Sequence, residues 1–292
     1  MSKRGVSPSF QNLPSPLHKG RGIQGEGFLK FSSVIFGYNS GIISLGNNQK
    51  MAIMEKLSLG AKKLGLELEP GQLEQFDIYY HQLVDWNKHI NLTAITGYEE
   101  VQIKHFLDSL TVTLAWQRAI TSADFRLIDV GTGAGIPGIP LKIAFPEIRL
   151  VLLEARAKKT AFLHHIADKL GLDNVEILVG RAEDVAHLSQ YRERFDLVLS
   201  RAVAPLPILV ELALPFCALG GSFIAQKKGD TGEEINQAAK AISLLGGNLR
   251  EVKRIDLDEF TDERRLVVID KISPTPPHYP RHPGIPSKRP LI

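Results

Sequence analysis

The feature that most constrains this chain is a regular alternation of short apolar runs with helical patterns. Runs rich in leucine or β-branched residues occupy residues 125–129, 150–153, 175–179, 195–199 and 222–226. Helical patterns lie between them, near residues 139–144, 158–170, 207–218 and 233–245. Strands that alternate with helices through short loops predict a parallel sheet with helices on both faces. We therefore expect an α/β, doubly wound fold.

The two ends of this region depart from the alternation. Strands are predicted at residues 250–257 and 265–272 with a turn and no helix between them, so a β-hairpin should close the sheet. Ahead of the sheet, Leu73, Phe76, Tyr80 and Leu83 recur at helical spacing, and a second helical pattern covers residues 99–116. We expect N-terminal helices in residues 51–122, packed on a sheet domain in residues 123–272.

Both termini have a different composition from the body of the chain. Residues 1–50 hold many glycines and prolines without a sustained period, so we expect a disordered leader. Met51 opens the first regular pattern and is a second candidate for the start of translation. The last 20 residues, 273–292, hold seven of the 17 prolines and no acid, which predicts an extended basic tail. A disordered solubilising tail and packing of Tyr279 back on the body are the alternatives.

Charge and composition narrow the class of protein. The net charge is +3, but residues 1–50 carry six Lys/Arg against one acid, so a polyanion should be bound locally at the basic ends. A single cysteine, Cys217, excludes a disulfide framework and a zinc site built on several cysteines. No run of about 18 apolar residues exists to span a membrane. We expect a cytoplasmic protein without a metal site.

The strongest local motif is a glycine-rich loop after the first predicted strand. Asp129 ends that strand, Gly131, Gly133, Gly135 and Gly138 follow, and Glu154 ends the next strand, where a carboxylate can accept hydrogen bonds from ribose hydroxyls. The spacing also fits a dinucleotide site. The acid at Asp129 favours S-adenosylmethionine, which is cationic where a dinucleotide carries pyrophosphate. A glycine-rich turn without a ligand is the remaining alternative.

Two further loops follow the third and fourth predicted strands. Glu183 either accepts a hydrogen bond from the adenine amine or caps the next helix. Arg201 should face the site, because open parallel sheets bind ligands at the carboxyl ends of their strands. Cys217 lies in an apolar run read as helical, where a packed thiol is favoured over a nucleophile. The absence of an Asp/Asn-Pro-Pro-Tyr run disfavours methylation of the adenine amino group.

Other polar groups remain ambiguous at this level. His105, Asp108 and Ser109 fall on neighbouring turns of the predicted 99–116 helix, where a structural hydrogen-bond cluster is favoured over direct catalysis. The pairs Lys158-Lys159 and Lys227-Lys228 are either solvated or in contact with phosphate.

With these motifs in hand, residues 51–270 resemble the bacterial 16S ribosomal RNA guanine-N7 methyltransferases, the glucose-inhibited division protein B family. The segments that carry the resemblance are Trp86–Thr93, His105–Leu110, Asp129–Pro140, Ser200–Ala202, Glu263–Ile269 and Tyr279–Leu291. Two departures are Glu154, where the family often has Asp, and the 50-residue leader, which has no counterpart in the family pattern.

The resemblance implies a Rossmann-like class I methyltransferase sheet with a C-terminal β-hairpin and an N-terminal helical extension. It implies that S-adenosylmethionine donates a methyl group to guanine N7 in 16S ribosomal RNA or a small-subunit particle. The family pattern gives cofactor contacts at Gly131, Ile136, Glu154, Ala155, Arg156, Ala182, Glu183 and Arg201, and functional arginines at Arg181, Arg201 and Arg264.

The residues and the resemblance together define the expected site. We expect Asp129, Gly133 and Gly135 to join the cofactor contacts, and Arg201 to position the substrate without a general base. The expected RNA contacts are Arg181, Arg264, Lys227, Lys228, Arg281, Lys288 and Arg289. We expect the protein to act as a monomer. An NAD-dependent oxidoreductase and a non-catalytic RNA-binding or regulatory protein are the alternatives.

Overall fold

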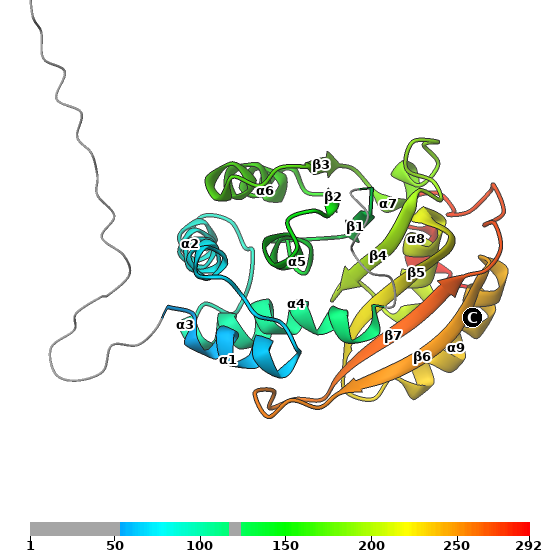
Figure 1. Cartoon of the computed structure of the whole chain (residues 1–292). Helices are drawn as coiled ribbons and strands as arrows, with labels where there is room; N and C mark the ends of the chain where they lie inside the picture. Colours follow the sequence, from blue (N-terminus) through cyan, green and yellow to red (C-terminus); the bar gives the residue numbers. More distant parts are fainter. Residues whose placement is uncertain (1–52, 117–123) are drawn as a thin grey trace, which may run out of the picture. The chain divides into compact units, whose positions relative to one another are not determined.

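A single seven-stranded sheet organises the computed structural model, which describes residues 53–116 and 124–292 (Figure 1). The predicted leader, 1–50, lies outside the described residues. The strand order is β3-β2-β1-β4-β5-β7-β6. The strands are β1 (Arg126–Val130), β2 (Arg149–Glu154), β3 (Val175–Val179), β4 (Phe195–Arg201), β5 (Cys217–Lys228), β6 (Gly247–Ile255) and β7 (Arg264–Lys271).

Strand direction confirms the predicted fold class. Strands β1 to β5 pair in parallel, whereas β7 pairs antiparallel with both β5 and β6. The carboxyl ends of β1, β2 and β4 therefore meet at one edge of the sheet, which the amino end of β7 joins. Ligands of open parallel sheets bind at this edge.

Alternate side chains of each strand enter two separate cores. Leu127, Leu150 and Leu199 face one core, and their neighbours Ile128 and Val151 face the other. The first core is covered by α1 (Glu55–Lys63), α2 (Pro70–Asn87), α5 (Gly138–Ala144) and α6 (Ala157–Leu170), and the second by α7 (Ala182–Val185), α8 (Leu206–Ala213) and α9 (Gly232–Leu244). The central strands β1, β2 and β4 are thus buried on both faces, as their continuous apolar sequences predict, whereas the edge strands β3 and β6 are partly exposed.

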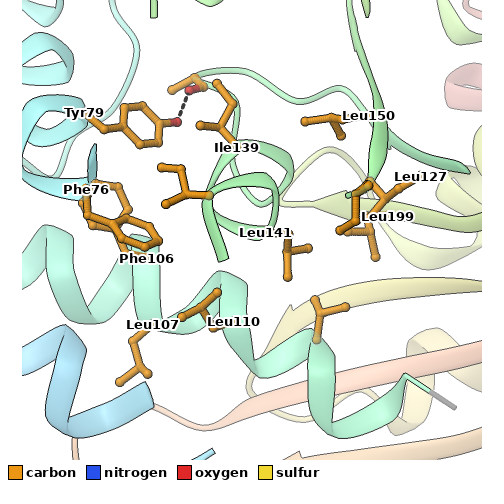
Figure 2. Packing of buried hydrophobic residues seen from close by; sticks show 14 of the residues in the cluster. Phe76, Tyr79, Phe106, Leu107, Leu110, Leu127, Ile139, Leu141, Leu150 and Leu199 are labelled. Carbon is orange, nitrogen blue, oxygen red and sulfur yellow. Dashed lines mark hydrogen bonds between the residues drawn. The ribbon is translucent and has the colours of Figure 1, made fainter. Parts of the chain in front are cut away.

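The second N-terminal helix has an irregular centre. A continuous helical segment begins with α3 (Tyr98–Val101), widens into a π-helical turn (Gln102–Leu107), and ends with α4 (Asp108–Leu110) and a 3₁₀ turn (Thr111–Ala115). Figure 2 shows Phe76 and Tyr79 of α2 packed against Phe106 of the π-helical turn, with ring centroids 5.0 and 5.2 Å from that of Phe106. Tyr79 also donates a hydrogen bond to the Ala134 carbonyl, which ties α2 to the glycine loop.

The secondary structure around Cys217 differs from the prediction. The expected helix over 207–218 ends at Ala213, a 3₁₀ turn follows over Leu214–Phe216, and Cys217 is the first residue of β5. Pro215 explains the early end, because proline cannot donate the helical hydrogen bond. The thiol is fully buried and burial raises its pKa to about 12, which agrees with a packed side chain.

The tail also differs from the prediction of an extended segment. Arg192 donates hydrogen bonds to the carbonyls of Thr275, Pro276 and Tyr279, and a short helix, α10 (Ile285–Lys288), follows. The side chain of Arg281 forms an ion pair with the fully buried Glu211, N to O 2.6 Å. A carboxylate buried in this way requires a cation, and the tail supplies it. Residues 273–292 are therefore packed on the α8 side of the sheet.

Candidate functional site

The glycine loop after β1 is held in place by Asp129. One oxygen of this carboxylate, Oδ2, accepts hydrogen bonds from Thr132 Oγ1 at 2.6 Å and from the Gly138 N–H at 2.9 Å. Gly131 has φ of 73°, and a Cβ there would stand 2.7 Å from the Val203 side chain. Only glycine combines this left-handed backbone with so close a contact. The sequence Gly-Thr-Gly thus allows the loop to turn sharply beneath the site.

Asp129 does not reach the site, although a direct cofactor contact was expected of it. The residue is fully buried and lines neither of the cavities described below. Burial raises its pKa to about 6, against the hydrogen bonds from Thr132 and Gly138. Its Oδ2 holds the glycine loop, and its Oδ1 is buried without a hydrogen-bond partner among the described residues.

Two adjoining cavities open at the carboxyl edge of the sheet. One, of about 280 Å³, is lined by the ends of β2 and β3 and includes Glu154, Ala155, Arg156, Ala182 and Glu183. The other, of about 170 Å³, is lined by the glycine loop and by Thr93, His105, Ile136 and Arg201. Gly131, Lys159 and Ala202 line both. These cavities bring together most of the residues predicted to contact the cofactor.

Glu154, the last residue of β2, lines the larger cavity. Its Oε2 accepts from the Gly133 N–H at 3.0 Å and its Oε1 from the Arg156 N–H at 2.9 Å. An ionised carboxylate has about four acceptor positions, so both oxygens retain capacity for two ligand hydroxyls. The residue also fixes the glycine loop of β1 to the end of β2.

The residues after β3 form the far wall of the larger cavity. Glu183 is almost fully buried, and one of its oxygens accepts a hydrogen bond from the Gly284 N–H of the tail, 3.1 Å away. Arg181 is exposed beside it. Glu183 of α7 and Glu154 of β2 thus line the same cavity. No side-chain cap by Glu183 is present at the start of α7.

Arg201, at the end of β4, contacts Lys104, His105 and Asp108 in a buried polar network. Its Nη2 donates to the Lys104 carbonyl at 2.8 Å and to His105 Nδ1 at 3.1 Å, and its Nη1 lies 3.2 Å from Asp108 Oδ2. The same His105 Nδ1 lies 3.1 Å from the Lys104 carbonyl oxygen, and Nε2 of the ring lies 2.7 Å from Thr93 Oγ1. Burial, and secondarily Arg201, lowers the pKa of His105 to about 4.

This network explains the polar cluster seen in the sequence. His105 and Asp108 orient Arg201, and Ser109 donates to the His105 carbonyl within the helix. The structural interpretation of the cluster therefore agrees with its contacts. The π-helical turn, which the sequence pattern did not reveal, brings His105 to the edge of the smaller cavity.

Several expected RNA contacts are already engaged within the protein. Arg264 is 3% exposed and forms ion pairs with Asp108 and Asp262. Lys227 pairs with Glu234, Lys228 with Asp262, and Arg281 with Glu211. Arg181, Lys288 and Arg289 are exposed. The sequence could not reveal these acidic partners, because most of them lie on other helices and strands.

Two residues at the centre of the site were not identified from the sequence. Thr93 lines the smaller cavity and lies at the end of the Trp86–Thr93 segment, which was a signal that could have placed it there. Ala202 lines both cavities and has φ of 55°, a left-handed conformation that is strained for alanine. No cluster of three or more metal-ligating side chains occurs in residues 53–116 and 124–292. Within the same residues, no helix is long and apolar enough to cross a membrane.

Four features together define a class I S-adenosylmethionine-dependent methyltransferase: the sheet order, its antiparallel β7, the glycine loop and the carboxylate at the end of β2. Residues 72–266 match the family model described as rRNA small subunit methyltransferase G. The ribosomal RNA small subunit methyltransferase G of Dehalococcoides mccartyi is 53% identical over 239 residues, 82% of this chain and 100% of the relative. This chain belongs to the rRNA small subunit methyltransferase G family.

Further comparisons give the range of similarity. The protein of the same name from Lachnoclostridium phytofermentans is 47% identical over 233 residues, 80% of this chain and 95% of the relative. Among solved structures, a precorrin-6y C5,15-methyltransferase of Geobacter metallireducens superposes with a TM-score of 0.43 at 17% identity, over 62% of this chain and 91% of that chain.

Proposed function

We propose that this protein transfers the methyl group of S-adenosylmethionine to N7 of a guanine in 16S ribosomal RNA. Membership of the family makes it an S-adenosylmethionine-dependent rRNA methyltransferase. The observation that carries the proposal is the arrangement at Arg201 and Ala202. These two residues line the smaller cofactor cavity and also a third cavity, whose lining includes Lys227, Lys228 and Arg264. A site for the cofactor thus adjoins a basic site for a nucleic acid.

The chemistry requires positioning more than proton transfer. When bound, S-adenosylmethionine supplies a sulfonium-linked methyl group. Guanine N7 has a free lone pair and no proton, so its attack forms the N–CH₃ bond while the S–CH₃ bond breaks. Aligning such reactants can lower the activation barrier by about 7–11 kcal/mol. Arg201 suits this role because three protein groups, the Lys104 carbonyl, His105 and Asp108, fix its guanidinium.

Cofactor contacts follow from the cavity walls. We assign the ribose to Glu154, the adenine side to Ala182 and Glu183, and the methionine side to the loop from Gly131 to Ile136 and to Arg201. Ala155 and Arg156 complete the wall after β2. Asp129 supports the loop from below.

Exposed cations are the expected contacts with RNA phosphates. Arg181 at the rim of the larger cavity, Lys228, and Lys288 and Arg289 on the tail are exposed. Lys228 also pairs with Asp262, and Arg264, Lys227 and Arg281 act through their ion pairs at the cavity wall or within the tail. We expect a cytoplasmic monomer acting on 16S RNA or on the assembling small subunit.

The decisive experiment maps N7-methylguanosine in 16S RNA from cells with and without the gene. One guanine should lose its methyl group in the deletion strain and regain it when the purified protein and S-adenosylmethionine are added. Methylation at a different base atom, or RNA binding without methyl transfer, would contradict the proposed reaction. Binding of NAD without S-adenosylmethionine would contradict the cofactor.

A further inference from the structure

Lys159 lies where the two cofactor cavities adjoin. It belongs to the first turn of α6, is half-buried, and lines both the larger and the smaller cavity. Its Nζ is close to Gly133, since a Cβ added to that glycine would stand 3.7 Å from Nζ. The ammonium group is therefore placed beside the glycine loop, within the cofactor site.

The ammonium of Lys159 differs from neighbouring cations because it has no partner. Within residues 53–116 and 124–292 its side chain makes no hydrogen bond and no ion pair. Arg201 of the same site pairs with Asp108, and Lys227 pairs with Glu234. Since charged groups that leave bulk water are normally paired, a half-buried ammonium without a counterion is available to an anionic group of a ligand.

The two cavities differ in the charges of their walls. The larger cavity has two carboxylates, Glu154 and Glu183. Among the described residues that line the smaller cavity there is no aspartate or glutamate, and the positive side chains are Lys159 and Arg201. His105, which also lines the smaller cavity, is neutral at pH 7, because burial lowers its pKa to about 4. The smaller cavity therefore favours an anionic group.

S-adenosylmethionine contains one anionic group, the carboxylate of its methionine part. Its sulfonium and amino groups are cationic and would be repelled by a lysine, and its ribose and adenine are uncharged. With the ribose at Glu154 and the adenine at Glu183, the methionine part extends along the glycine loop into the smaller cavity. Lys159 lines both cavities, so its ammonium lies beside this path, and the carboxylate is the part of the cofactor that suits it.

We propose that the Lys159 ammonium binds the carboxylate of S-adenosylmethionine through a charge-assisted hydrogen bond from Nζ to a carboxylate oxygen. Lys159 is then a cofactor-binding residue of α6 that holds the end of the methionine part. The assignment rests on the placement of the ribose and the methionine part given under the proposed function. It does not depend on which base of the RNA receives the methyl group.

The test compares S-adenosylmethionine with its decarboxylated form, which lacks the carboxylate and keeps the sulfonium, the amino group, the ribose and the adenine. In isothermal titration calorimetry, the wild-type protein should bind the decarboxylated form roughly tenfold or more weakly. Lys159→Met keeps the length of the side chain and should weaken binding of S-adenosylmethionine roughly tenfold, with binding of the decarboxylated form unchanged or slightly tighter. The preference should therefore fall about tenfold, as expected for a direct contact.

Matched variants separate the charge from its position. Lys158 is the exposed residue that precedes Lys159 on α6 and lines neither cavity, so Lys158→Met should leave both affinities at wild-type values. Lys159→Arg keeps the positive charge and should retain most of the preference for the carboxylate. Equal weakening of both compounds by Lys159→Met would overturn the assignment, since the side chain would then act without contacting the carboxylate.

Two further outcomes distinguish the possible failures. Unchanged affinity of Lys159→Met for S-adenosylmethionine, together with a higher KM for 16S RNA, would place the lysine on an RNA phosphate and overturn the proposal. Should Lys159→Met not fold, equal wild-type affinities for the two compounds would overturn it. If the wild-type protein does not bind S-adenosylmethionine, the cofactor of the proposed function is wrong, and the assignment of Lys159 is lost with it.

Discussion

Glu154 shows how one side chain can serve both the loop and the ligand. Its two oxygens accept from the N–H groups of Gly133 and Arg156, and the residue lines the larger cavity. The sequence placed the carboxylate at the end of a strand but could not show that it also fixes the neighbouring loop. Loss of the side chain therefore removes ligand contacts and loosens the loop that lies under the ligand.

We expect Glu154→Ala to weaken S-adenosylmethionine binding tenfold or more, since each hydrogen bond to a charged acceptor contributes about 1.5–3 kcal/mol. Isothermal titration calorimetry measures the change. The control Glu147→Ala removes an exposed carboxylate just before the other end of β2 and should leave affinity intact. Unchanged affinity in Glu154→Ala would remove this residue from the cofactor site.

His105 gives the molecule a specific acid sensitivity. Its folded-state pKa is about 4, below the ordinary value of 6.5, because burial and the Arg201 guanidinium disfavour the charged ring. The neutral ring therefore contributes stability that is complete above pH 6.5 and is lost as pH falls from there toward 4. The loss between pH 7 and pH 4.5 should amount to about 2–3 kcal/mol.

Gln does not titrate, so His105→Gln should remove the part of the stability loss between pH 7 and pH 4.5 that comes from His105. Urea unfolding at the two pH values measures the free energy of unfolding for both proteins. Asp129, whose raised pKa of about 6 acts in the opposite direction, is present in both and cancels in the comparison. An equal loss of stability in the two proteins would show that His105 does not carry the effect.

At the scale of elements, the docked tail is the largest departure from the sequence-based prediction. Prolines and basic residues gave no sign that Arg281 would meet Glu211, a residue 70 positions away on α8. The same docking buries Tyr279 and brings the Gly284 N–H to Glu183 at the cofactor cavity. A deletion of the whole tail would therefore disturb stability and the cofactor wall together, so single substitutions give the cleaner test.

We expect Arg281→Met to destabilise the protein by about 3 kcal/mol, because it leaves the buried Glu211 carboxylate without its cation. The double variant Arg281→Met/Glu211→Gln should regain most of this loss, since the uncompensated charge is then gone. Arg289→Met, at an exposed position of the same tail, should change the free energy of unfolding by less than about 0.5 kcal/mol. Equal effects of Arg281→Met and Arg289→Met in chemical denaturation would contradict the importance of the buried pair.

At the scale of the whole molecule, the local pattern predicted the sheet but not the contacts between distant elements. The spacing of apolar residues and the positions of glycines are local properties of the sequence. The strands, the hairpin and the glycine loop could therefore be located from them. The ion pair of Arg264 with Asp108, the engagement of Lys227 by Glu234 and the π-helical turn at His105 depend on segments far apart in the chain. For that reason the sequence located the strands and the glycine loop better than the contacts of the polar network beside them.

The leader provides the last test at this scale. Residues 1–50 have no periodic apolar pattern with which to enter a core, and we expect their deletion to change neither the melting temperature nor methyl transfer. A longer deletion, of residues 1–69, is the matched control, because it also removes α1 and the fully buried side chains of Met54, Leu57 and Ala61. Burial of a Leu or Met side chain contributes about 1.5–3 kcal/mol, so the longer deletion should clearly lower the melting temperature.

Differential scanning calorimetry and a labelled-methyl assay on the same preparations compare the three proteins. A lower melting temperature for the 1–50 deletion alone would show that the leader packs on the body, and slower methyl transfer at unchanged stability would show that its six basic residues contact RNA.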